Sequence, residues 1–412
     1  MSKSQSPEPG FLLGSDKKNK APKTNLTPAL HQYFEAKAQS PDSVLFFQMG
    51  DFYELFFEDA TMAAPLLDLT LTSRQKLNDQ PVPLCGMPLS AADNYINRLV
   101  SLGHKVAVCD QIGKVLPGSG LAKRQITRIV TPSTVLSAEG QNQARFLAAL
   151  LHRDDEFILT AVDLSTGDFI AGRFFDYSSF QTAVRAIDPA EIVINAEVFE
   201  TGPDLVALAD SLGVLTTKLA AENFDPERGR TELSAALGPE AGPETFSGWP
   251  NLLAAGGATL SYLRDLAGGA GLKHLSRPRL LWEQGFMILD EAATRNLELF
   301  KPARDGDHKA TLIAQIDLTK TPMGARLIRD WLARPLIDRR TIEERLGAVE
   351  TLTDELLTRQ DLKEALSLGG DLERALSRLT LGRGTIRDLL TIRRTLKAAP
   401  KIKELLSQSK SS

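Results

Sequence analysis

The sequence predicts a multidomain fold in which α/β regions are followed by an all-α region. Up to about residue 271, short apolar runs that alternate every second residue are interspersed with segments of helical spacing. Beyond about residue 283, apolar residues recur almost only three or four positions apart. A chain of 412 residues has room for two to four domains. We place them at residues 26–138, 139–271 and 283–412, behind a Lys-, Ser-, Pro- and Gly-rich stretch, residues 1–25, that is expected to be a disordered basic tail.

The overall composition is that expected of a cytoplasmic globular protein. The hydrophobic content of 42% suffices for globular cores, and the sequence contains no apolar run that could span a bilayer. The N-terminus lacks the apolar core of a secretory signal. The two cysteines, Cys85 and Cys109, do not make a disulfide framework and suit a reducing compartment. Since the five histidines are scattered, we predict no metal site.

Charge is unevenly distributed along the chain. The net charge of −4 argues against a protein that is basic throughout, but local charge decides whether nucleic acid can bind. The segment 105–128 carries five basic residues against the single acid Asp110. An ordinary solvated surface explains such a run as well as a phosphate-binding surface does.

The first predicted domain begins with a helix that Thr27 caps and Pro28 opens. It is followed by a hairpin in which two apolar arms, residues 45–49 and 52–57, flank a turn at Gly50 and Asp51. The remaining predicted elements are a helix at 59–67, a strand at 68–72, a loop at 81–86, a helix capped by Ser90 and ending at Gly103, and strands at 105–109 and 126–130.

The second arm of the hairpin carries an unusual pair of residues. Two-residue alternation places Phe52 and Glu54 on one face of the strand and Tyr53 on the other. A core face does not accept a carboxylate readily, so the face with Phe52 and Glu54 is expected to look outward. The structural alternative is a solvent-edge strand whose Phe folds onto a neighbouring loop.

The second predicted domain opens with a hairpin, residues 157–164 and 169–174, around a turn at 165–168. Residues 188–194 lead from a helix into a strand. The Gly-, Pro-, Ala- and Glu-rich stretch 229–250 is predicted to be a surface loop. A helix follows at 251–267, and the pair Gly256 and Gly257 is expected to weaken it.

The third region consists of helices whose apolar stripes indicate helix packing. Thr321 and Pro322 supply a cap and a first-turn proline for one of them. The other helices are predicted at 290–300, 342–356, 362–366, 372–379 and 386–396.

Several sequence blocks resemble the MutS family of DNA mismatch repair proteins. The string from Met49 to Ala60, MGDFYELFFEDA, resembles the signature of the mismatch-recognition domain of that family. Further blocks have counterparts in the same order, at 66–72, 85–88, 104–111 and 128–132 in the first domain, at 157–174 and 188–194 in the second, and at 289–298, 321–326 and 370–374 in the helical region.

The resemblance implies a fold and a site. The fold is a small mixed α/β mismatch-recognition domain, a ribonuclease-H-like α/β connector domain, and a helical core/lever domain that is cut short. By resemblance, Phe52 enters mismatched double-stranded DNA at a mispaired or looped base and Glu54 bonds the displaced base. A wedge must unstack a base step, which costs less at a weakly stacked mispair. Arg74, Lys105, Arg124 and Arg128 are weaker candidates for phosphate contacts.

The resemblance also implies what this chain lacks. The family continues into a clamp and an ATPase domain, but no Gly-x-x-x-x-Gly-Lys-Ser/Thr loop occurs here. We therefore expect no ATP hydrolysis and no cofactor in this chain, with ATP and Mg²⁺ bound only by the missing ATPase domain. The chain is then a fragment or the product of an interrupted gene, bacterial in type, cytoplasmic and nucleoid-associated. Because paired ATPase domains supply much of the family's dimer interface, it is expected to be mostly monomeric.

Two alternatives stay open. The chain could be a non-catalytic fragment that binds a MutL-type repair partner through the connector, without useful affinity for DNA. Alternatively, the connector could be a metal-dependent nuclease, since ribonuclease-H-like nucleases hold two metal ions with carboxylates. Asp163 would be the first carboxylate, with Asp168 and Glu191 as partners. The structural alternative is that Asp163 simply begins a hairpin turn, where Asp is favoured.

Overall fold

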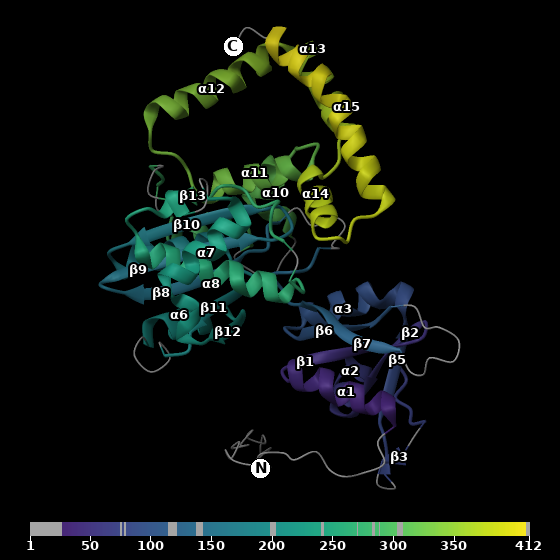
Figure 1. Cartoon of the computed structure of the whole chain (residues 1–412). Helices are drawn as coiled ribbons and strands as arrows, with labels where there is room; N and C mark the ends of the chain where they lie inside the picture. Colours follow the sequence, from purple (N-terminus) through teal and green to yellow (C-terminus); the bar gives the residue numbers. More distant parts are fainter. Residues whose placement is uncertain are drawn as a thin grey trace, which may run out of the picture.

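The structure, a computed structural model, describes residues 27–74, 76–77, 80–113, 122–136, 143–197, 203–239, 243–269, 271–281, 285–287, 289–302 and 308–408. Figure 1 shows two separate α/β bodies and a helical region that extends away from them. The predicted succession of α/β regions and then helices is confirmed. The tail predicted at residues 1–25 lies outside the described residues. None of the described helices combines the length and apolar character needed to cross a membrane.

The first body is built on a five-stranded mixed sheet with the strand order β5-β2-β1-β6-β7. Its strands are β1 (Ser43–Met49), β2 (Phe52–Phe56), β5 (Leu84–Pro88), β6 (Lys105–Ile112) and β7 (Lys123–Val130). The central strand β1 runs antiparallel to β2 and parallel to β6. A separate two-stranded hairpin consists of β3 (Lys76–Leu77) and β4 (Gln80–Pro81).

Helices cover both faces of this sheet, as the alternation along β1 requires. Leu45 and Phe47 pack with α1 (Pro28–Gln39), whereas Val44 and Phe46 pack with α2 (Phe57–Leu67) and α3 (Ala92–Ser101). The predicted start of α1 is confirmed, because the Thr27 hydroxyl accepts a hydrogen bond from the Leu30 amide at 3.4 Å.

Three local predictions in the first body are wrong. The strand predicted at 68–72 is absent because Asp68 takes a left-handed conformation, φ 56°, that ends α2. Within that stretch only Thr72 pairs, in an isolated bridge with Leu84. The loop predicted at 81–86 runs into β5, which pairs along β2. Ser90 does not cap α3, since it lies inside a short 3-10 helix at Leu89–Ala91.

The second body has a six-stranded sheet with the strand order β12-β11-β8-β9-β10-β13. The strands are β8 (Leu147–Arg153), β9 (Glu156–Asp163), β10 (Asp168–Phe174), β11 (Glu191–Asn195), β12 (Leu215–Leu219) and β13 (Arg279–Leu280). The hairpin predicted around residues 165–168 is confirmed as β9 and β10. The strands β8, β9 and β10 are antiparallel neighbours, and β11 runs parallel to both β8 and β12.

Helices also cover both faces of the second sheet. One face packs against α4 (Tyr177–Ile187) and α6 (Pro203–Leu212), and the other against α7 (Pro226–Leu237) and α8 (Pro250–Leu266). The surface loop predicted from residue 229 is therefore wrong over its first part, which is helical. The helix predicted at 251–267 forms as α8 with Gly256 and Gly257 inside it, and Gly257 lies at the crossing with α7, since a Cβ there would lie 2.2 Å from the Cα of Gly229.

The helical region contains seven described α-helices. They are α9 (Glu291–Asn296), α10 (Leu312–Ile316), α11 (Pro322–Ala333), α12 (Arg339–Asp354), α13 (Leu356–Ser367), α14 (Leu372–Thr380) and α15 (Ile386–Gln408). In Figure 1, α10, α11 and α14 lie near the second body, while α12, α13 and α15 reach outward. The predicted cap of α11 is confirmed, because the Thr321 hydroxyl accepts from the Gly324 amide at 3.1 Å. The helix predicted at 290–300 ends early, at Asn296.

Candidate nucleic-acid interface

The β1–β2 hairpin holds the two residues that the sequence singles out. Met49 faces Phe52 and Phe47 faces Glu54 across the pair, with the turn at Gly50 and Asp51 as predicted. Gly50 takes a φ of +63°, a conformation that glycine adopts without steric cost. The carbonyl of Gly50 accepts a hydrogen bond at 3.1 Å from the Gln48 side chain, so the turn is fastened to its own strand.

Phe52 is the exposed aromatic of this hairpin. Its relative exposure is 47%, whereas Phe46 and Phe47 are fully buried and Tyr53 is 8% exposed. The outward face predicted from the alternation is therefore confirmed. Other exposed phenylalanines of the described residues have partners: Phe34 packs on Phe57 at a centroid distance of 5.2 Å, and the Phe175 ring lies under Arg173 at 4.7 Å. No comparable ring contact is found for Phe52 within the described part of the chain, so its ring is free to stack on something else.

Glu54 lies two residues further along the same face, and its side chain is largely buried. Its side chain is 15% exposed, and its carboxylate Oε1 lies 3.3 Å from Nη1 of Arg74, whose side chain is 75% exposed. Burial raises the pKa of Glu54, and the positive charges of Arg74 and Arg124 oppose that rise. Gly86 faces Glu54 across β2 and β5, and a Cβ there would lie 3.5 Å from Cγ of Glu54. A Cβ at position 86 would thus touch the Glu54 side chain and lie closer, at 3.1 Å, to the Tyr53 carbonyl oxygen.

The opposite face of the strand is anchored by a buried polar chain. The Tyr53 hydroxyl donates to Oδ1 of Asp110, and the Thr127 hydroxyl donates to Oδ2 of the same carboxylate. Burial and this neighbouring carboxylate raise the pKa of Tyr53. Because Tyr53 is fixed in this way, the residues on either side of it are held facing outward.

Sequence reasoning missed these supporting residues. No sequence motif marks them, because each supports the hairpin through a contact with a strand that is distant in sequence. They are Gln48, Gly86 and Asp110. The side chain of Gln48 accepts a hydrogen bond from the Gln111 amide at 2.7 Å, which ties the turn to β6. Only for Gly86 was there a signal, the short apolar run of Leu84, Cys85 and Met87 around it, which is consistent with a buried strand.

Arg124 lies on the same face of the sheet as Glu54, but its guanidinium is engaged by β1. Its Nε donates to the Gln48 carbonyl at 2.6 Å, and its guanidinium stacks 4.9 Å above the ring of Phe47. Burial lowers the pKa of Arg124, and Glu54 is among the negative groups that counter this. This geometry favours a bracing role over the phosphate contact that the sequence predicts.

Lys105 and Arg128, in contrast, point away from the hairpin. The Lys105 ammonium donates to the Thr217 hydroxyl at 2.9 Å and the Tyr262 hydroxyl at 3.4 Å, both in the second body. Nη2 of Arg128 lies 3.2 Å from Asp93, in a cavity that residues of α14 and α15 also line. Of the six predicted site residues, the structure therefore brings together Phe52, Glu54 and Arg74, and places Arg124 on the same face of the sheet.

The carboxylates of the nuclease alternative serve structural contacts. Asp163 is fully buried, and its Oδ1 accepts from the amide and the hydroxyl of Ser165 at 2.8 and 2.7 Å, as expected for a turn. Glu191 accepts from Ser133 at 2.6 Å and from Tyr262 at 2.7 Å. Asp168 lies 3.4 Å from Arg279. The described residues contain no group of three or more His, Cys, Asp or Glu side chains that could hold a metal ion.

Comparison with known families covers all three parts of the chain. Residues 27–139 match the model of MutS domain I, residues 145–276 that of MutS domain II, and residues 292–412 that of MutS domain III. The hairpin with Phe52 and Glu54 lies in the match to domain I.

Curated relatives agree with these matches. The chain is 34% identical to the DNA mismatch repair protein MutS of Desulfitobacterium hafniense, over 94% of this chain and 43% of that protein. It is 40% identical to that of an Anaeromyxobacter species, over 92% and 43%, and 37% identical to that of Desulfosudis oleivorans, over 92% and 43%. The chain thus spans less than half the length of these relatives, and with domains I, II and III matched in order, it belongs to the MutS family.

Proposed function

We propose that this chain acts in DNA mismatch repair by binding mispaired or looped bases in duplex DNA, with Phe52 as the inserted wedge. Two lines of evidence support the proposal: the curated relatives are named DNA mismatch repair proteins, and Phe52 presents an exposed ring at the start of β2, with no ring contact among the described residues. The exposure of Phe52, 47% in a hairpin whose other aromatics are buried, is the observation that carries it.

The energetics of a wedge favour mispaired steps. Inserting a side chain between base pairs costs a few kcal/mol of lost stacking and bends the duplex. Stacking of the aromatic ring on a base returns about 1–3 kcal/mol, whatever the base. A mispaired step is stacked and paired more weakly, so the net balance is favourable there and unfavourable in matched DNA.

In the proposed mechanism, Glu54 increases the preference for mispaired over matched DNA. A carboxylate close to phosphates is repelled by any duplex, so it needs a compensating hydrogen bond from an exposed base edge. Only a displaced base offers that edge. In the free protein Arg74 compensates the charge of Glu54 at 3.3 Å, and we propose that DNA binding exchanges this ion pair for the base contact.

For the second body we propose a ribonuclease-H-like connector without nuclease activity. Numbered from β8 in chain order, the strand order is 6-3-2-1-4-5, with the first three strands antiparallel and the others parallel to the first. The acids Asp163 and Glu191 are already engaged by Ser165, Ser133 and Tyr262. We therefore propose binding, and no catalysis, as the function of the described domains.

The decisive experiment measures fluorescence anisotropy of two labelled duplexes that differ only by one G·T mispair. Wild type, Phe52→Ala and Phe175→Ala are compared at low salt. We expect tighter binding of the mispaired duplex by wild type and by Phe175→Ala, which loses an exposed ring in the second body. Phe52→Ala should lose about 5- to 150-fold in affinity for the mispair, the equivalent of one base–aromatic stack.

Two results would overturn the proposal. If all three proteins bind both duplexes equally, the hairpin does not read mispairs in this chain. If Phe175→Ala loses the preference as well, the effect is not specific to the hairpin.

A further inference from the structure

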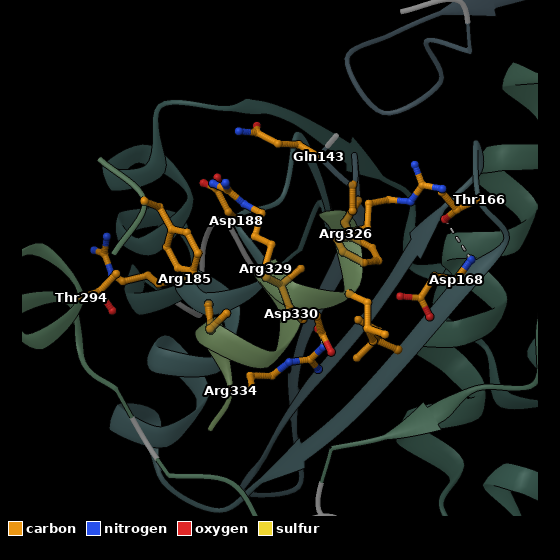
Figure 2. Close-up of a pocket in the computed structure, with 18 of the residues that line it drawn as sticks. Gln143, Thr166, Asp168, Arg185, Asp188, Thr294, Arg326, Arg329, Asp330 and Arg334 are labelled. Atoms are coloured by element: carbon orange, nitrogen blue, oxygen red, sulfur yellow. Dashed lines mark hydrogen bonds and ion pairs between the residues drawn. The ribbon is translucent and has the colours of Figure 1, made fainter. Parts of the chain in front are cut away.

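A large cavity lies between the second body and the helical region. Its volume is about 1000 Å³, at the upper end of the usual size of small-molecule sites. Residues of α4, β10, α11 and the segment around Phe300 line it. Figure 2 shows Arg185, Asp188 and Arg329 gathered at one end, with Thr166 and Asp168 at the other.

The charges at the Asp168 end of the cavity are balanced. Arg279 lies 3.0 Å from Asp330 and 3.4 Å from Asp168, and Arg334 pairs with Asp330. Glu373 is held by Arg326 at 2.7 Å. These ion pairs use three of the four acidic residues in the lining, which leaves Asp188 as the acid of the opposite end.

The Arg329 end of the cavity has an excess of positive charge. Arg185, Arg295, Lys301 and Arg329 line it, against the exposed Asp188. The guanidinium of Arg329 stacks 4.5 Å above the ring of Phe300 and makes no hydrogen bond or ion pair with any described residue. Burial lowers the pKa of Arg329, and the more distant charge of Asp188 opposes this only through space. A half-buried guanidinium without a partner is costly unless an anion binds it.

We propose that this cavity binds a small organic phosphate, with the phosphoryl group held between Arg329 of α11 and Arg185 of α4. The planar guanidinium forms paired, charge-assisted hydrogen bonds to phosphate oxygens. Stacking on Phe300 orients Arg329, and the hydrogen bond at 2.9 Å from Arg185 to Ser211 orients Arg185. Apolar lining residues such as Ile170, Leu212 and Leu327 suit the organic part of the ligand.

The site joins two parts of the molecule. Arg185 belongs to the second body and Arg329 to the helical region, so one phosphoryl group bound to both would hold α4 and α11 together. Binding to the folded state alone raises the temperature of unfolding. This inference is independent of the proposed DNA contact, because neither arginine lies in the first body.

The test is isothermal titration calorimetry of the full chain with inorganic pyrophosphate, with AMP and with adenosine, at constant ionic strength. We expect saturable one-to-one binding of pyrophosphate and AMP, but not of adenosine. Arg329→Gln should weaken binding at least about tenfold, since it removes charge-assisted hydrogen bonds. Arg339→Gln is the matched control, because Arg339 lies in the same helical region with a side chain that is 90% exposed and pairs with Glu343.

Three outcomes would overturn the proposal. These are no saturable binding at millimolar pyrophosphate, equal weakening by Arg329→Gln and Arg339→Gln, and equal binding of AMP and adenosine. Should Arg329→Gln fail to fold by circular dichroism, Arg185→Gln replaces it, with the same expected loss. Unchanged mispair binding by the folded variant separates this site from the DNA interface, whereas weakened mispair binding with unchanged AMP binding would assign the arginine to DNA instead.

Discussion

The carboxylate of Glu54 and the guanidinium of Arg74 lie 3.3 Å apart, on the face from which Phe52 projects. Residue 74 lies beyond α2 and beyond the end of the hairpin in sequence, so the pair exists only in the folded domain. As a consequence, Arg74 compensates the negative charge of Glu54 in the protein without DNA.

Removing Arg74 should raise the pKa of Glu54 further, because its positive charge opposes the effect of burial. The free energy of unfolding should change by less than about 0.5 kcal/mol in Arg74→Gln, since an exposed ion pair contributes little. The measurement is a ¹³C NMR titration of the Glu54 side chain. Arg98→Gln is the control, as it breaks another exposed pair of the same domain, with Asp68 at 2.7 Å, and should leave the Glu54 titration unchanged. Identical titrations in all three proteins would contradict a functional pair.

The affinity for matched DNA should increase as the pH falls, through Glu54. Because burial raises the pKa of Glu54, the folded protein takes up this proton above the ordinary value for Glu, about 4.3. The neutral carboxyl no longer repels phosphates, so binding strengthens as the pH falls toward that value. In Glu54→Gln this component should disappear, and the preference for mispaired DNA should fall at neutral pH. Fluorescence anisotropy with matched and mispaired DNA across the pH range tests both expectations. Parallel pH curves for wild type and Glu54→Gln would exclude Glu54 as the titrating group.

The crossing of α7 and α8 should not tolerate a methyl group. In Gly257→Ala the new Cβ would lie 2.2 Å from the Cα of Gly229, so the helices must separate, which costs about 1–3 kcal/mol or more. Gly347→Ala in α12 is the matched control, since a Cβ there meets nothing within 4 Å. The control should stabilise by up to about 1 kcal/mol, from the helix propensity of Ala. Thermal unfolding of the two variants should therefore shift in opposite directions, and a shared direction would mean that the close crossing does not determine stability.

We predict that Lys105 stabilises the contact between the two bodies and does not bind a DNA phosphate. Lys105→Met should lower the unfolding temperature, because the hydrogen bonds to Thr217 and Tyr262 in the second body are lost, at about 1 kcal/mol in total. The slope of log affinity against log salt for DNA should stay unchanged. A true phosphate contact would reduce that slope by about 0.9, and such a reduction would return Lys105 to the DNA interface.

Local chemistry made much of the fold predictable. The cap of α1 at Thr27, the turn at Gly50 and the hairpin at residues 165–168 each depend on residues close together in sequence. The errors arose where distant partners override local preference. Leu84–Pro88 has prolines on both sides, yet β2 supplies its hydrogen-bonding partner. Gly229 reads as a loop residue, yet α8 needs a residue without a side chain at that position.

The candidate site, too, was predictable where it depends on neighbouring residues. The alternation of side chains along any strand places Phe52 and Glu54 on one face and Tyr53 on the other, buried one. Only the tertiary structure decided which cation accompanies Glu54. Of the four basic candidates, Arg74 reaches its carboxylate, Arg124 binds the Gln48 carbonyl on the same face, and Lys105 and Arg128 lie at contacts with other parts of the chain. The physical reason is that an ion pair depends on distances of a few ångströms between residues tens of positions apart, and packing alone sets those distances.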